Sequence, residues 1–300
     1  MDSRTTTDQV AFWEQVVRDG CALPPEPPLD ELTIELSGLL GSPDGHQRDE
    51  LAYRVLAAWI SRGVYDDLLT GLGDGMSVGL ANALGDDGTD SIFRRSFSAL
   101  ILAEVVARDT EAELLHPDTL LRWGDSGLRW LVKERDLRGM VPGKGWAHAV
   151  AHGADLVLSL GLSRHFGHGE LMVLLDAVAD RLLEPTTYRL VHGEDERMAY
   201  AVMGILHRNV VEMDLLGPWL ERLATGWSGP GMSYDSAVAF NAASFLRVLH
   251  LQLQLGVRPL MSAGRASGHF DSDVANRIDL LGGIARHLRG TAPYFRQRTS

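Results

Sequence analysis

The sequence predicts an all-α fold of antiparallel helix pairs, stacked in a HEAT-like α-superhelix or in a compact helical array. Apolar residues recur at steps of three and four, as at Leu171, Leu174, Leu175, Val178 and Leu182, which is the helical period. The alternation of apolar and polar residues that marks a strand is nowhere sustained, so we expect no sheet. Glycines recur between the periodic segments, which indicates short turns between neighbouring helices.

Polar caps and glycines set the bounds of each expected helix. Asp118 follows Pro117 at the start of one helix, and Gly63 and Gly139 lie just beyond the ends of two others. The expected helices span residues 8–19, 30–40, 47–62, 64–71, 76–84, 91–108, 118–135, 145–161, 168–183, 195–208, 212–225, 234–255 and 272–289. No fixed sequence period relates them, so any repeat would be structural.

Proline and loop-forming residues divide the chain into three expected parts. Residues 1–28 combine a first helix with a Pro-rich arm that cannot continue it. Residues 29–258 form the main helical domain. Residues 259–300 contain a loose connector from Ser262 to Asp273 and finish with a last helix packed on the main domain.

Composition limits the partners of the protein. The 300 residues include 28 Lys and Arg against 40 Asp and Glu, a net charge of −12, which argues against nucleic-acid binding. No apolar run approaches the roughly 18 residues that a membrane-spanning helix needs. The start lacks the layout of a signal peptide, and the single Cys21 cannot form an internal disulfide. We therefore expect a cytoplasmic protein that binds a small-molecule ligand or a protein partner.

Residues 134–155 are the richest in side chains that can do chemistry. A helix ends among charges, a loop with Pro142 turns the chain, and a second helix is expected from about Trp146. Because the chain reverses there, we expect the polar groups on both sides of the turn to share one cleft. The residues expected in this cleft are Glu134, Asp136, Arg138, Lys144 and His148.

Lys144 would lie at the start of the second helix, where the helix dipole favours an anion. The alternative is an ion pair between Lys144 and Glu134 or Asp136. Polar residues farther along the chain are expected to complete a ligand site, although they could equally cap and pin helices. The expected ligand-binding residues are Glu134, Arg138, Lys144, Trp146, Glu194, Arg197 and Asn241.

His148, His152 and Asp155 stand at i, i+4 and i+7, so on one helix all three would project from the same face. Two imidazoles one turn apart can share a divalent metal such as zinc, and a carboxylate could be the third ligand. With Asp136, the same imidazoles are the candidate catalytic groups for acid–base steps. The alternative is that these side chains are hydrogen-bonded across a close helix crossing. Neither a cofactor nor enzymatic turnover follows from the spacing alone.

A second acidic segment has the spacing of a magnesium-binding motif. Asp86, Asp87 and Asp90 match the aspartate-rich motif of prenyl-transferring and terpene-cyclising enzymes. Because Gly85 and Gly88 interrupt the segment, we expect a loop and a helix cap in place of the helical face that this motif needs.

Several segments resemble, in the same order, those of the bacterial family catalogued as domain of unknown function 2785. The most specific likeness is the run from Gly143 to Asp155, preceded by Glu134, Asp136, Arg138 and Gly139. Further likenesses cover residues 48–53 with 59–60, 93–100, 193–197 and 241–247, so the resemblance extends over about residues 30–255. It implies an all-helical, HEAT-like architecture and a single functional centre that includes the polar residues above, but no activity.

Two functions remain in view. In the first, the polar pocket from Glu134 to Asp155 binds a small anionic or metal-assisted ligand, with or without turnover. In the second, a helical-repeat scaffold without catalysis docks a basic protein partner. A buried cluster of mutually compensating charges would favour the first function, whereas charges spread along successive helices would favour the second.

Overall fold

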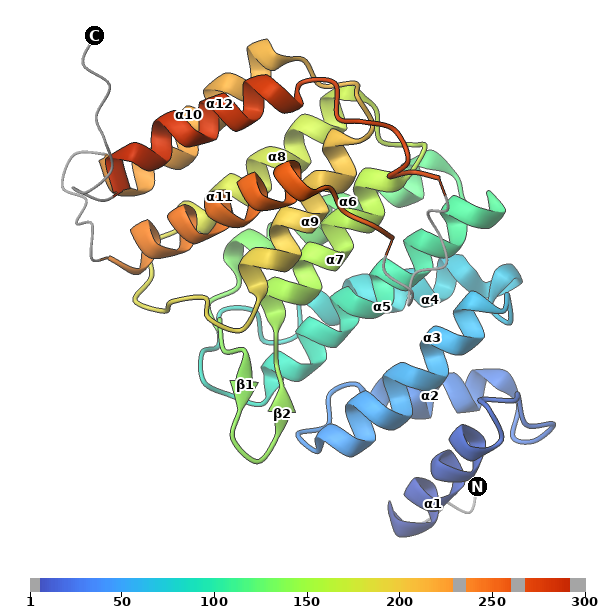
Figure 1. Cartoon of the computed structure of the whole chain (residues 1–300). Helices are drawn as coiled ribbons and strands as arrows, with labels where there is room; N and C mark the ends of the chain where they lie inside the picture. The colour runs from blue at the N-terminus through green and yellow to red at the C-terminus, as the bar shows by residue number, and fades with distance from the viewer. Residues whose placement is uncertain (1–5, 229–235, 260–267, 292–300) are drawn as a thin grey trace, which may run out of the picture. The chain divides into compact units, whose positions relative to one another are not determined.

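The computed structural model describes residues 6–228, 236–259 and 268–291, which are predominantly helical (Figure 1). This described part contains twelve α-helices and one two-stranded sheet. The predicted all-α fold is therefore confirmed. The chain divides into two compact units, residues 1–152 and residues 153–300.

The first unit carries six complete α-helices and a hairpin. In chain order its elements are α1 (Thr6–Arg18), α2 (Leu29–Leu39), the π-helix η1 (His46–Tyr53), α3 (Arg54–Ser61), the short helix η2 (Asp66–Leu68), α4 (Leu69–Leu80), α5 (Ser91–Ala112), α6 (Pro117–Lys133), β1 (Met140–Val141) and β2 (Gly145–Trp146). Helix α5 packs against α3 and α4, and α4 also packs against α6. Trp59 and Phe93 are completely buried among these helices, so the core of the unit lies around α5.

Helix α4 is continuous over residues 69–80, where the sequence predicted a break between two helices, 64–71 and 76–84. The glycines that suggested a break include one that a close crossing requires. A Cβ at Gly73 would lie 2.2 Å from the ring of Trp123 in α6, and the indole of Trp123 donates to Asp74 Oδ1 at 2.8 Å. The two helices can approach this closely only because residue 73 has no side chain.

The expectation of no sheet is wrong at one place, where β1 and β2 form a short antiparallel hairpin. Met140 pairs with Trp146, and Val141 pairs with Gly145. Gly143 and Gly145 adopt positive φ angles of 73° and 83°, which glycine tolerates and which the tight turn needs. The helix predicted over 145–161 therefore begins later, as α7 (Ala149–Leu162).

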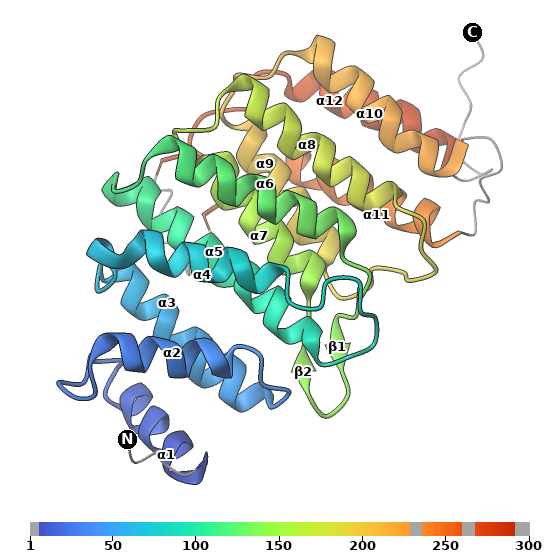
Figure 2. The same ribbon diagram turned by 180° about the vertical axis from the view of Figure 1, so that it is seen from behind.

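The second unit contains the rest of α7 and the remaining helices. These are α8 (His168–Leu183), α9 (Glu194–Leu206), α10 (Met213–Ser228), α11 (Ala237–Leu255), α12 (Arg277–Leu288) and the short helix η4 (Arg289–Thr291). Helix α9 packs against α11, and α10 packs against α8 and α12 (Figures 1 and 2). Trp219 of α10 is buried and donates its indole N–H to the carbonyl of Leu175 in α8 at 2.8 Å.

The connectors between helices agree with the sequence-based expectations over the residues that the structure describes. Residues 22–28 join α1 and α2 without helix, as the Pro-rich arm predicted. Of the connector expected from 262 to 273, residues 262–267 lie outside the described residues and residues 268–272 form turns. The expected domain bounds at 28 and 258 stay predictions, while the boundary between the two compact units falls after His152, inside α7.

Within residues 6–228, 236–259 and 268–291, no helix combines the length and the apolar character needed to cross a membrane.

Candidate functional site

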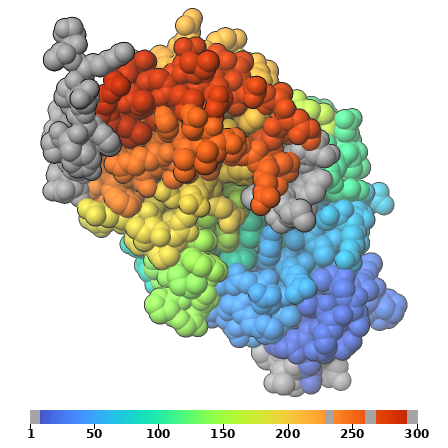
Figure 3. Space-filling view, viewed as in Figure 1, coloured from blue at the N-terminus to red at the C-terminus, as the bar shows by residue number. Residues whose placement is uncertain are grey.

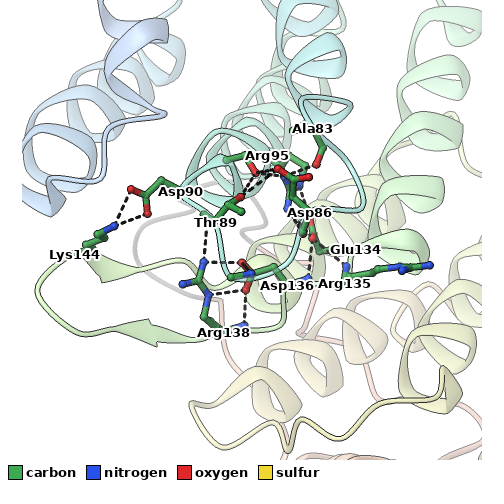
Figure 4. Close-up of polar contacts among 12 residues, drawn as sticks. Ala83, Asp86, Thr89, Asp90, Arg95, Glu134, Arg135, Asp136, Arg138 and Lys144 are labelled. Atoms are coloured by element: carbon green, nitrogen blue, oxygen red, sulfur yellow. Dashed lines mark hydrogen bonds and ion pairs between the residues drawn. The ribbon is translucent and has the colours of Figure 1, made fainter.

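The predicted charges of residues 134–144 lie together, and the loop between α4 and α5 supplies several of their partners (Figure 4). Glu134 follows the end of α6, and Arg95 lies in the second turn of α5. Their side chains are 1% and 0% exposed. Arg95 donates from Nε to Glu134 Oε2 at 2.6 Å and from Nη2 to Oε1 at 2.9 Å. This two-point ion pair ties the end of α6 to α5.

The Glu134 carboxylate accepts further hydrogen bonds within its own segment. The indole of Trp130 donates to Oε2 at 2.9 Å. The backbone N–H groups of Arg135 and Asp136 each donate to Oε1 at 3.0 Å. With the two bonds from Arg95, these donors fill the acceptor sites of a carboxylate. In this arrangement the Glu134 carboxylate clamps the end of α6 to α5, and its ligand-binding role stays a prediction.

Asp136 is buried and holds Arg138 beside the loop that precedes α5. Arg138 donates from Nε to Asp136 Oδ1 at 2.8 Å and from Nη2 to Oδ2 at 2.6 Å. The backbone N–H of Gly88 donates to Oδ2 at 3.1 Å, and Arg138 also reaches the carbonyl of Thr89 at 2.7 Å. The hydrogen bond to Asp136 raises the pKa of the Arg138 guanidinium above its ordinary value. These bonds fasten residues 136–138 to the 86–90 loop.

Lys144 lies in the turn of the hairpin, which corrects its expected place at a helix N-terminus. Its partner is Asp90, with Nζ at 2.6 Å from Oδ1 and 2.7 Å from Oδ2. Neither predicted partner, Glu134 nor Asp136, takes this role. The 86–90 segment is a loop, as predicted, and Asp90 immediately precedes α5.

Arg48 holds the other side of the hairpin from the π-helix η1. Its fully buried guanidinium donates from Nη2 to the carbonyls of Lys144 at 2.9 Å and Trp146 at 3.1 Å, and to Asp49 Oδ2 at 2.8 Å. Burial lowers the pKa of Arg48, and the neighbouring Asp49 opposes that shift. Burial likewise raises the pKa of the Asp49 carboxyl, with Arg48 opposing. The hairpin is therefore fixed by buried hydrogen bonds on one side and by Lys144 on the other.

A row of rings leads from the interior of the first unit to its surface. Phe97 lies 4.8 Å from His152, and His152 lies 6.1 Å from His148, measured between ring centroids. His148 stacks on Trp146 at 4.2 Å with an interplanar angle of 24°. Trp146 is 38% exposed, His148 half-buried and His152 buried. Atoms in the colours of residues 140–150 reach the surface in Figure 3.

His148 precedes α7, so it does not share a helix face with His152 and Asp155 as predicted. Its backbone has a positive φ of 51°, which few residues other than glycine adopt. Its N–H donates to the carbonyl of Arg138 at 3.1 Å, and its carbonyl accepts from the N–H of His152 at 2.9 Å. His148 thus ends the hairpin segment and begins the hydrogen-bond ladder of α7.

The remaining predicted residues lie in the second unit. Arg197 of α9 donates from Nε to Asp155 Oδ1 at 2.9 Å and from Nη2 to Oδ2. The Glu194 carboxylate is buried and accepts from the N–H of His192 at 2.7 Å. Asn241 accepts from the N–H of Leu190 at 2.9 Å and donates to the carbonyl of Tyr188 at 3.1 Å. These side chains fix α9, α11 and the chain segment before α9.

The predicted zinc centre gains no support from this arrangement. Across the described ranges, no group of three or more His, Cys, Asp or Glu side chains is placed to hold one metal ion. Both oxygens of Asp155 face Arg197, which competes with a cation for them. The metal assignment to His148, His152 and Asp155 stays a prediction.

The sequence analysis missed three partners, Arg95, Asp90 and Phe97, and it did not connect Arg48 with the hairpin. All four lie far along the chain from the groups that they contact, from the 39 positions between Arg95 and Glu134 to the 96 between Arg48 and Lys144. The run from Phe93 to Phe97, with two adjacent arginines opening a helix, was the available signal. An arginine on the apolar side of a helix usually needs a buried acid.

A family model described as "Protein of unknown function (DUF2785)" matches residues 80–251. No curated protein and no solved structure matches the chain.

Proposed function

The chain belongs to the DUF2785 family of proteins of unknown function, and we propose that it binds a small planar anion at the surface formed by Trp146 and His148. The stack of His148 on Trp146, at 4.2 Å and 24°, carries this proposal. The ring of Trp146 is partly exposed to solvent, so a flat ligand can stack on its outer face. The imidazole behind it can donate a hydrogen bond and, when protonated, carry a positive charge.

The charges around the two rings favour an anion. The amino-terminal end of the fourteen-residue helix α7 begins directly after His148, and the helix dipole makes that end partially positive. Arg138 and Lys144 come from the same hairpin segment, although each is paired with an aspartate. A metal is not needed for this mode of binding.

The backbone that carries and contacts the two rings has unusual conformations that are typical of functional sites. The π-helix η1 is a rare conformation that occurs frequently at functional sites, and its Arg48 holds the carbonyl of Trp146 at 3.1 Å. The positive φ of His148 is a second unusual backbone feature in the same place. If turnover occurs, His148 is the group that would carry a proton, because the carboxylates of Glu134 and Asp136 are engaged by arginines.

The scaffold function is less well supported. Its expected sign was charge spread along successive helices, whereas the charged groups described above compensate one another in pairs, as Arg95 does with Glu134 and Arg138 with Asp136. A HEAT-like superhelix that docks a basic partner remains the alternative proposal.

Thermal unfolding in the presence of benzoate, with inorganic phosphate as a non-planar anion, tests the proposal. We expect benzoate to raise the melting temperature by several degrees, since a ligand at a hundred times its Kd adds about 2.7 kcal/mol and 1 kcal/mol corresponds to about 2–4 °C in a domain of this size. Phosphate should raise it less because it cannot stack.

Trp146→Ala and His148→Gln should each abolish the benzoate shift. The matched control is His116→Gln, which changes an exposed histidine outside the site and should keep the shift. A benzoate shift that survives in both site variants, or the absence of any shift with the unaltered protein, would contradict the proposal.

A further inference from the structure

A groove between α2 and α4 has the size of a small-molecule site. Its volume is about 670 Å³, within the roughly 300–1,000 Å³ that ligand pockets occupy. Helix α2 supplies Thr33 and Ile34, the short helix η2 supplies Leu68, and Tyr65 and Arg94 also line it. Ile34 and Leu68 are 73% and 52% exposed, which is high for apolar side chains. All of these residues belong to the first unit, and the groove lies outside the ring surface proposed above.

Glycines keep the groove open without serving a close helix crossing. A Cβ at Gly38, Gly71 or Gly75 would meet no atom within 4 Å, and all three line the groove. Gly73 of the same helix is different, because a Cβ there would strike Trp123 at 2.2 Å. The glycines that face the groove therefore leave empty space where larger side chains would fit.

The two ends of the groove differ in charge. The Tyr65 hydroxyl lies 2.8 Å from Thr33 Oγ1, near the beginnings of α2 and α4, where Asp30 and Asp67 also line the groove. Arg94 donates from Nη1 to the carbonyl of Ser37, near the end of α2. At 1.5 Å per residue, the seven positions from Asp30 to Ser37 place the acidic and basic ends about 10 Å apart.

Arg94 is a half-buried cation whose charge is not compensated in the way that the charge of Arg95 is. Burial lowers the pKa of the Arg94 guanidinium, and no charged neighbour contributes to that shift. Within the part of the chain that the structure describes, its hydrogen bond goes to a neutral carbonyl, whereas Arg95 next to it forms an ion pair with Glu134. A carboxylate placed at the Arg94 end would supply the missing negative charge.

We propose that this groove binds an elongated apolar molecule with one carboxylate head, such as a free fatty acid. The head would lie at Arg94, and the apolar chain would follow Ile34, Leu68 and the open glycines. Asp30 and Asp67 at the far end would repel a second carboxylate and so select monocarboxylates.

Filling the groove is the first test, with dodecanoate as the probe and isothermal titration calorimetry as the measurement. Gly71→Leu places a side chain in open space on a helix and replaces glycine by a better helix former, so the fold should be kept. We expect the Kd of dodecanoate to rise about tenfold or more. The matched control is Gly169→Leu in α8, where a Cβ also meets no atom within 4 Å, and which should leave the Kd unchanged.

The head group is tested at Arg94. Arg94→Gln should weaken dodecanoate about tenfold or more because a charge-assisted hydrogen bond is lost, and Arg94→Lys should restore part of that loss. Dodecanol should bind the unaltered protein more weakly than dodecanoate does, and Arg94→Gln should not weaken dodecanol further. Dodecanedioate should bind more weakly than dodecanoate.

Three results would overturn the proposal. One is dodecanoate binding that is absent, or that is the same in Gly71→Leu as in the unaltered protein. Another is equal affinity for dodecanoate and dodecanol. The third is binding to phosphatidylglycerol vesicles, lost in Gly71→Leu, without any binding of free dodecanoate, which would assign the groove to a membrane surface.

Discussion

At the scale of single residues, the region is organised by arginines that hold buried or loop acceptors. Arg95 and Arg138 each make a two-point ion pair with a buried carboxylate, whereas Arg48 donates mainly to backbone carbonyls. A buried ion pair contributes little net stability over an apolar pair, but the loss of one partner leaves the other charge in the interior. The effect of a substitution therefore depends on which charge remains.

Glu134→Gln should be strongly destabilising, because it leaves the fully buried guanidinium of Arg95 without a counter-charge. We expect the free energy of unfolding, measured in urea, to fall by about 3–5 kcal/mol. The control is Asp125→Asn, which removes a carboxylate from the exposed pair with Arg129 and should cost at most about 1 kcal/mol. Equal costs for the two variants would mean that the buried pair does not hold α6 to α5.

At the scale of elements, the sequence predicted helices well where one apolar face is buried and less well where glycines occur. The α5 and α6 helices lie close to their predicted ranges because their apolar period is uninterrupted. The hairpin at 140–146 was missed, since strands of two residues are too short to show an alternation. The break expected between 71 and 76 is absent because Gly73 serves packing against Trp123.

The candidate site was predictable only in its local part. The grouping of Glu134, Asp136, Arg138 and Lys144 followed from the turn at Pro142, which one segment of sequence contains. Their partners, such as Arg95 and Asp90, depend on where the start of α5 lies relative to the end of α6 and the hairpin, and no local pattern specifies that. Only tertiary packing brings such distant groups together.

The turn of the hairpin gives a prediction at this scale. Gly143 and Gly145 both have positive φ, so alanine at either position is strained by about 1–2 kcal/mol. Gly145→Ala should cost more than Gly143→Ala, because its Cβ would also lie 3.1 Å from Arg48 Nη2, while a Cβ at 143 meets nothing within 4 Å. Urea unfolding would measure both. Equal losses of stability in the two variants would indicate that Arg48 Nη2 moves away from the new methyl group.

At the scale of the whole molecule, acid should weaken the second unit. Burial lowers the pKa of His207, His269 and His287 below the ordinary value of 6.5. Below about pH 6.5 the unfolded chain therefore binds more protons than the folded chain does, so stability falls as the pH decreases through that value. Hydrogen exchange at about pH 7.5 and pH 5.5, corrected for the intrinsic rates, should show reduced protection in α9 and α12 at the lower pH.

His269→Gln should reduce this pH dependence, since a glutamine amide does not titrate yet can still donate to the carbonyl of Gly204, as His269 Nε2 does at 2.8 Å. His116→Gln, on an exposed histidine of the first unit, should leave the pH dependence of the second unit as it is. Protection that is the same at both pH values in the unaltered protein would contradict the assignment.

The boundary between the two compact units has a consequence for how the gene can change. It falls after His152, inside α7, where no linker composition marks it and where a cut would divide a continuous helix. The segment matched by the family model, residues 80–251, takes parts of both units. It leaves out α1 to α3, α12 and all of α4 except Leu80, and it ends inside α11. The matched segment therefore differs from the compact units. An exchange of gene fragments at codon 152 would break α7, so we expect such exchanges to be better tolerated in the loops between helices than at this boundary.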